Sequence, residues 1–95
     1  MKYKWDEDKY LKEALEYINK TYTLHYAGNG EEKDVMQFTE YFAEKNSLEE
    51  VIAAFKFNVQ KYAERYGKKK GYNREDLLKV IHYSIMMLAV VDKNK

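Results

Sequence analysis

Apolar residues recur at intervals of three and four along most of the chain, and this spacing is typical of amphipathic helices. It predicts a first helix over roughly Glu7–Tyr22, with an apolar stripe made of Leu11, Ala14, Leu15, Ile18 and Tyr22. Glycine and asparagine are concentrated in His25–Gly30, which we therefore expect to be a loop. A second helix is expected over about Glu32–Lys45, with the apolar stripe Val35, Phe38 and Phe42.

Two further helices have clear start and stop signals. Ser47 and Glu50 form the S-x-x-E pattern of a capping box, in which each side chain bonds the backbone N–H of the other residue. The helix that follows is expected to end at Gly67, because glycine readily takes the left-handed conformation found just after helices. Asn73 precedes an acidic turn and a nearly continuous apolar segment, so a fourth helix is expected to begin there.

No segment shows the alternation of a strand, so the expected fold class is all-α. A chain of 95 residues suits a single domain, and we expect residues 1–95 to form one compact bundle of about four helices. The connection between the last two helices is about six residues long, which favours an antiparallel hairpin. Such a hairpin places Gly67–Gly71 between the end of the third helix and the start of the fourth.

Charge is unevenly distributed along the chain, although the formal net charge is only +1. Residues 56–74 hold seven basic residues and one acidic residue, whereas residues 1–55 hold seven basic and twelve acidic residues. Screening at physiological salt acts over about 8 Å, so the basic segment would attract a compact anion locally. The nearly neutral chain as a whole is not expected to bind a membrane surface.

Composition excludes several other classes of site. The chain has no cysteine, and its two histidines, His25 and His82, are far apart in sequence, so no metal site and no cofactor are expected. The longest apolar stretch, Val80–Val91, is shorter than the about 20 residues that cross a bilayer, and the N-terminus does not resemble a signal peptide. We therefore expect a cytoplasmic protein. Ten tyrosines, whose rings suit half-buried positions, favour a homo-oligomer.

The candidate binding residues lie on the third helix and the loop after it. Offsets of three and four place Asn58, Lys61 and Arg65 on one side of that helix, and Lys68 and Lys69 follow in the segment G-K-K-K-G. Arginine presents a planar fork to phosphate oxygens, lysine presents a point charge, and asparagine can bond a base edge or a hydroxyl. The set predicts a phosphate-binding site, with a solvated basic face as the alternative. The loop is not a P-loop, since it lacks the G-x-x-x-x-G-K-[ST] pattern.

The fourth helix also offers polar residues that share a face. Asp76, Lys79 and Tyr83 follow one another at offsets of three and four, and so do Glu75, Lys79 and His82. Either set could support an anion site or form pairs on the helix surface, and the sequence leaves this choice open.

Residues 25–88 resemble a small domain family of tailed phages that has long been catalogued as of unknown function. The residues that carry the resemblance run from His25 to Tyr83 in the pattern HY…D-V…F-x-x-N-x-x-K-Y-x-x-R-x-G-K-K…D-L-x-K-x-x-x-Y. One member is a phage nucleotide kinase without a P-loop, and short members in T-even-like phages are the Cef proteins, modifiers of suppressor tRNAs. Phe57 departs from the glycine that relatives often carry, and the N-terminal region of the kinase is missing, so the resemblance does not carry kinase activity over.

The resemblance implies a phage protein in the cytoplasm of the infected bacterium, with a shared site made of His25, Asn58, Lys61, Arg65, Lys68 and Lys69. The expected function is binding of nucleotide or RNA phosphate, with action on tRNA or nucleotide pathways during infection. Two alternatives stay open. One is a nucleotide kinase-like phosphotransferase in which His25 or His82 moves a proton, and the other is an anti-defence protein that sequesters a nucleotide signal or blocks a host protein.

Overall fold

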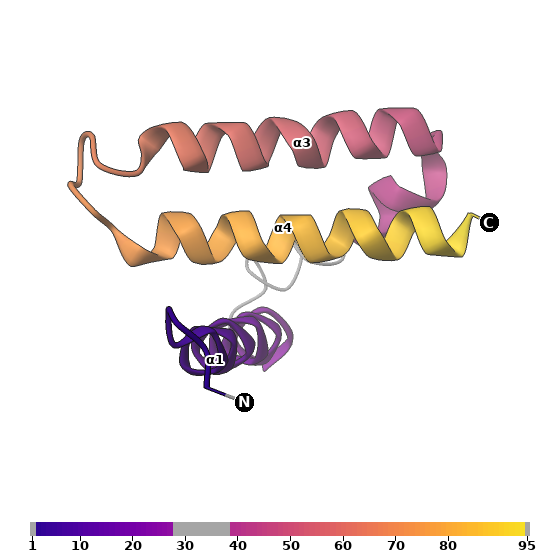
Figure 1. Ribbon diagram of the computed structural model, residues 1–95. Helices are drawn as coiled ribbons and strands as arrows, with labels where there is room; N and C mark the ends of the chain where they lie inside the picture. The colour runs from indigo at the N-terminus through magenta and orange to yellow at the C-terminus, as the bar shows by residue number, and fades with distance from the viewer. Residues whose placement is uncertain (1, 28–38, 95) are drawn as a thin grey trace. The chain divides into compact units, whose positions relative to one another are not determined.

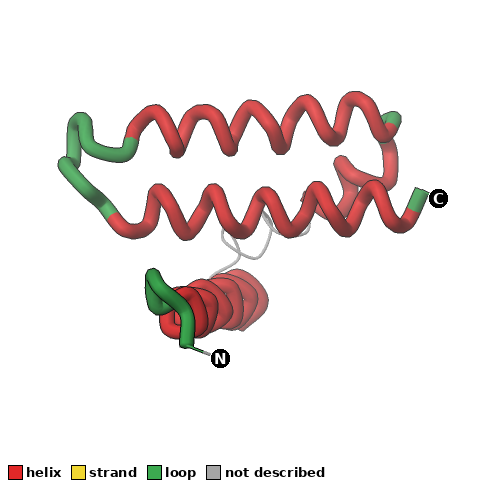
Figure 2. The backbone as a smooth tube through the Cα atoms, in the orientation of Figure 1, coloured by secondary structure: helices red, strands yellow, loops and turns green. Residues whose placement is uncertain are grey.

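A computed structural model describes residues 2–27 and 39–94 of the chain (Figure 1). Within these residues all regular structure is helical and there is no strand (Figure 2). The helices are α1 (Glu7–Ala27), a short segment at residues 39–45, α3 (Leu48–Arg65) and α4 (Arg74–Lys93). The predicted all-α fold class with four helices is confirmed. The N-terminal part of the second expected helix lies outside the described residues.

The chain falls into two compact units, residues 1–38 and residues 39–95. The expected single domain over residues 1–95 stays a prediction. None of the helices in residues 2–27 and 39–94 is both long and apolar enough to cross a membrane.

Helix α1 runs past the end that the sequence suggested. It continues to Ala27, so His25 belongs to the helix and not to a loop. Thr21 is β-branched and therefore has a low helix propensity, but its hydroxyl donates to the carbonyl of Tyr17 one turn earlier, at 2.9 Å. Threonine can make this bond without leaving the helical conformation, so its low intrinsic propensity does not end the helix here.

The start of α3 follows the predicted capping box. The backbone N–H of Glu50 donates to the hydroxyl of Ser47 at 3.2 Å, and the N–H of Ser47 donates to the Glu50 carboxylate at 2.9 Å. These reciprocal bonds satisfy two backbone donors that the first turn of a helix leaves open. They also lower the pKa of the Glu50 carboxyl, the backbone bond having the larger effect.

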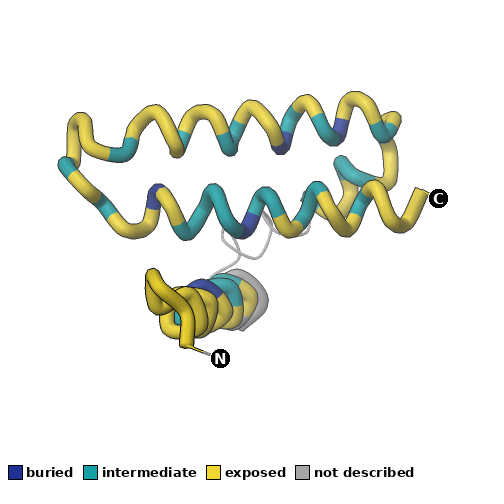
Figure 3. The backbone as a smooth tube through the Cα atoms, viewed as in Figure 1, coloured by how far each residue is buried: buried dark blue, intermediate teal, exposed yellow. Residues whose placement is uncertain are grey.

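Helices α3 and α4 lie side by side and antiparallel, as the sequence predicted (Figure 1). Asn73 caps α4 by accepting the backbone N–H of Glu75 at 3.1 Å, which confirms the expected start. Buried positions on the two helices alternate with exposed ones along the hairpin (Figure 3). The ring of Phe55 on α3 lies 5.8 Å from the ring of Tyr83 on α4, and this contact fixes the two helices laterally.

The connection between α3 and α4 is a tight turn. Gly67 follows the C-cap of α3 with φ +87°, which confirms it as the left-handed stop. Its N–H donates to the carbonyl of Gly71 at 2.7 Å, and the N–H of Gly71 donates to the carbonyl of Lys68 at 3.0 Å. Gly71 also has a positive φ, +64°. The backbone bonds close the turn and leave Lys69 exposed at its tip.

Candidate anion-binding site

Three positive side chains gather around the ring of Tyr62 on the α3–α4 hairpin. The ammonium nitrogens of Lys61 and Lys79 lie 4.7 Å and 4.8 Å from the ring centroid, and the guanidinium carbon of Arg65 lies 5.4 Å from it. All three distances are within the about 6 Å over which a ring attracts a cation. Lys61 and Arg65 come from successive turns of α3 and Lys79 comes from α4, so the packing of the two helices assembles this group. We call it the cation cluster.

The three charges of the cation cluster repel one another. Because each lies close to the same ring centroid, any two of them are within about 10 Å, which is comparable with the Debye length at physiological salt. At that separation two unit charges repel by about 0.4 kcal/mol in bulk water, and by more at the lower effective dielectric of a protein surface. An anion bound among them would turn this repulsion into attraction.

Asp76 lies beside the cation cluster and is almost completely buried. The residue is only 2 % exposed, and its Oδ1 lies 3.8 Å from a guanidinium nitrogen of Arg65. That distance permits an ion pair but is too long for a hydrogen bond. The second carboxylate oxygen, Oδ2, is buried with no hydrogen-bond partner among the described residues. Since an unsatisfied buried carboxylate is costly, its attraction to Arg65 matters for the stability of the hairpin.

Tyr62 is itself part of a stack of aromatic rings. Its ring lies 6.3 Å from the ring of Tyr83, nearly parallel at 15°. Burial, together with a smaller effect of Tyr62, raises the pKa of the Tyr83 hydroxyl. The platform on which the cations sit is therefore held by packing between the helices.

The structure brings together only some of the six residues predicted for the site. Lys61 and Arg65 converge on Tyr62. Lys68 instead pairs with the carboxylate of Glu64, one turn earlier on α3, and this contact lowers the pKa of Glu64. Lys69 is exposed at the tip of the turn.

The structure gives less information on Asn58 and His25. The amide of Asn58 donates to the carbonyl of Ala54 at 3.2 Å, so it bonds its own helix. His25 lies in α1, in the other unit, and its side chain falls outside the described part of the chain. The grouping of all six predicted residues into one phosphate site stays a prediction.

Sequence reasoning left three members of this arrangement, Tyr62, Lys79 and Asp76, out of the predicted site. Lys79 and Asp76 were predicted either to support an anion site on the fourth helix or to form pairs on its surface, and they were not joined to the residues of the third helix. The short turn between the helices could have predicted their membership, because an antiparallel hairpin places the start of α4 beside the end of α3.

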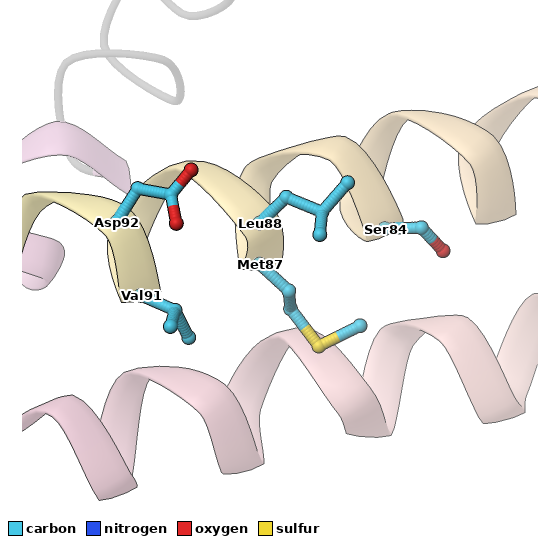
Figure 4. Close-up of a pocket in the computed structure, with 5 residues that line it drawn as sticks. All are labelled: Ser84, Met87, Leu88, Val91 and Asp92. Atoms are coloured by element: carbon cyan, nitrogen blue, oxygen red, sulfur yellow. The ribbon is translucent and has the colours of Figure 1, made fainter.

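A separate, mostly apolar groove lies on the C-terminal half of α4 (Figure 4). It is lined by Ser84, Met87, Leu88, Val91 and Asp92, has a volume of about 540 Å³ and is open to solvent. Its lining contains no basic residue, so it is unsuited to phosphate. The described residues contain no group of three or more histidine, aspartate or glutamate side chains that would hold a metal ion.

Comparisons of the chain with protein-family models, with curated proteins and with solved structures give no match. The resemblance to a phage domain family therefore stays a prediction.

Proposed function

We propose that the cation cluster binds the phosphate of a nucleotide or of RNA. The observation that supports this proposal is the convergence of Lys61, Arg65 and Lys79 on one ring. Arginine offers paired donors that match two phosphate oxygens, and the lysines add charge from either helix. Phosphate is favoured over a carboxylate because its larger charge and its additional oxygens can engage more than one cation at once.

An aromatic side chain near the basic turn favours a ligand that also carries a base. Tyr72 follows the turn directly and is 78 % exposed, with its ring tilted against Tyr66 at 5.4 Å. Exposed rings beside basic residues provide stacking surfaces for nucleobases. In this proposal Lys68 and Lys69 extend the positive surface along a nucleotide chain, and Asn58 and His25 complete the contacts to the ligand.

The proposal places the protein in the cytoplasm of a phage-infected bacterium, where it acts on tRNA or nucleotide pathways, as the family resemblance implies. A homo-oligomer is part of this proposal, since the many tyrosines suit subunit contacts.

Binding is tested by titrating the protein with ATP in a calorimeter, and with a labelled tRNA by fluorescence anisotropy. Lys61→Ala and Lys79→Ala each remove one charge from the cluster, and Lys56→Ala removes the same charge from an exposed position elsewhere on α3. We expect each cluster variant to weaken binding by about tenfold, because a charge-assisted hydrogen bond contributes about 1.5–3 kcal/mol. Lys56→Ala should bind like the unaltered protein. Equal affinities for all three variants would refute the site.

Arg65 needs a different substitution, since Arg65→Ala would also leave the buried Asp76 without its partner. Arg65→Lys keeps the charge and removes the planar fork, so it should weaken binding while preserving the fold. Repeating the tRNA titration at several salt concentrations separates the two ligands. A slope that exceeds the one measured with ATP indicates contacts with several RNA phosphates, whereas equal slopes indicate that the site engages no more phosphate charge on RNA than on the triphosphate of ATP.

A further inference from the structure

The side of α4 that faces away from α3 is strongly apolar. Asp76, Lys79 and Tyr83 contact α3 and define the inner side. At 100° per residue, the opposite side carries an apolar set of six residues, namely Leu77, Leu78, Ile81, Ile85, Leu88 and Ala89. We call this set the outer face of α4. Three members, Leu77, Ile85 and Leu88, are exposed large apolar side chains. A contiguous exposed apolar stripe marks an interaction surface.

The outer face ends in opposite charges. Arg74 and Asp92 are separated by about five complete helical turns, so they lie on the same side of α4 as the apolar set, one at each end. A second helix of the same sequence complements this pattern when it runs antiparallel, because its aspartate then meets the arginine of the first. Parallel pairing would set like charges against each other.

We propose that α4 packs antiparallel against α4 of a second copy of the chain, around a two-fold axis at the level of Tyr83. In this register Arg74 lies opposite Asp92 of the second copy, and the symmetry repeats the pair at the other end. Between the charged ends, Leu78 lies opposite Leu88 and Ile81 lies opposite Ile85. Every apolar position of the outer face between the charges then has an apolar position near it.

The groove on α4 fits the same register. Leu77 of the second copy stands at the level of residue 89, over the space lined by Ser84, Leu88 and Val91. The small side chain of Ser84 leaves room there for a leucine. Figure 4 shows Leu88 and Asp92 projecting from α4 on the side opposite to Met87, so a docked helix can reach both the groove and the charge.

The size of the surface sets the expected affinity. A helix of 20 residues is about 30 Å long, and a contact between two such helices falls at the small end of specific interfaces. Arg74 and Asp92 also have interactions within their own chain, so the pairs between copies extend those interactions and do not rescue unpaired charges. We therefore expect a reversible dimer that dissociates at micromolar concentration. The inference is independent of the anion site, because Lys79 lies on the inner side of α4.

Charge reversal tests the register directly. Arg74→Asp and Asp92→Arg each create two repulsive pairs in the dimer, whereas the double variant restores both attractions in the opposite sense. Both substitutions suit α4 itself, since an acid at its first turn and a base at its last turn complement the helix dipole. Loss of the dimer could therefore not be attributed to unfolding of α4.

Sedimentation velocity and native mass spectrometry from about 1 μM to about 1 mM should show a concentration-dependent dimer. Each single reversal, and Leu88→Glu, should raise the dissociation constant at least about tenfold, and the double reversal should return it to within about threefold. Lys56→Asp is the control for charge, and Phe57→Glu is the control for loss of an exposed apolar side chain, since Phe57 on α3 is 63 % exposed and Leu88 is 68 % exposed. A monomer at every concentration would overturn the proposal. So would a double reversal as weak as the single ones, or equal effects of Phe57→Glu and Leu88→Glu.

Discussion

The turn between α3 and α4 predicts that its two glycines respond unequally to alanine. Gly67 has φ +87°, and a Cβ atom added there would lie 3.1 Å from Cε1 of the Tyr72 ring. Gly71 has φ +64°, and a Cβ atom added there would meet nothing within 4 Å. Both substitutions force alanine into a left-handed backbone, but only Gly67→Ala adds a steric conflict. The pair therefore separates the cost of the backbone from the cost of the contact.

The magnitudes follow from these two terms. Alanine in a left-handed backbone conformation destabilises the folded state by about 1–2 kcal/mol. The lower conformational entropy of the unfolded variant offsets about 0.4–1 kcal/mol of this loss. We expect Gly71→Ala to reduce the free energy of unfolding by about 1 kcal/mol. At Gly67 the Tyr72 ring must also move, which disturbs its packing on Tyr66 at 5.4 Å. Aromatic pairs contribute about 0.5–1.5 kcal/mol, so Gly67→Ala should cost about 1.5–2.5 kcal/mol.

Urea and thermal unfolding, followed by circular dichroism, measure this difference. One kcal/mol corresponds to a change of about 4–8 °C in the midpoint for a domain of up to 100 residues. In a Tyr72→Ala background the added Cβ atom has no ring to meet, so the two glycine substitutions should become nearly equal. Equal effects in the unaltered background would refute the reasoning, and so would a difference that persists without the Tyr72 ring.

Three further predictions concern the helices themselves. Because burial raises the pKa of Tyr83 above its usual 10.0, ultraviolet titration should show one tyrosine ionising late, and Tyr83→Phe should remove that component. The stability that depends on neutral Tyr83 is complete below pH 10.0 and is lost as the pH rises through the raised pKa. Ser47→Ala should cost about 1 kcal/mol in urea unfolding. NMR titration should show the pKa of Glu50 rising only part of the way toward 4.5, because the backbone N–H at position 47, which has the larger effect, is retained. Arg65→Ala should reduce the free energy of unfolding by about 1–3 kcal/mol, because it leaves the buried Asp76 carboxylate without its ion-pair partner. This cost is smaller than that of breaking a fully buried pair, since the Arg65 side chain is 44 % exposed. The loss should be much smaller when Asp76→Asn is already present.

The sequence predicts best those features that depend on neighbours along the chain. The capping box at Ser47, the cap at Asn73 and the left-handed Gly67 each involve residues a few positions apart, and each is confirmed. The end of α1 was wrong for a related reason. Low helix propensity at Thr21 is a weak preference, and a single hydrogen bond to the preceding turn outweighs it.

The sequence predicted only part of the candidate site, because the site depends on which residues of two helices come into contact. The helical spacing placed Lys61 and Arg65 on one side of α3, and the loop segment G-K-K-K-G added Lys68 to the predicted site. Glu64 precedes Lys68 by four residues, and its carboxylate forms an ion pair with the Lys68 ammonium.

The membership of Lys79 in the cation cluster follows from the register of the hairpin, and the register follows from the turn. Because backbone hydrogen bonds from Gly67 and Gly71 close the turn, α4 must begin at a fixed level relative to the end of α3. That level places the first turn of α4 beside Arg65, and the next turn brings Lys79 to the ring of Tyr62. A pattern of charges along a single helix contains no information about this level. The positively charged site therefore depends on the geometry of the turn as much as on the basic residues. The two glycines of the turn determine which basic residues meet.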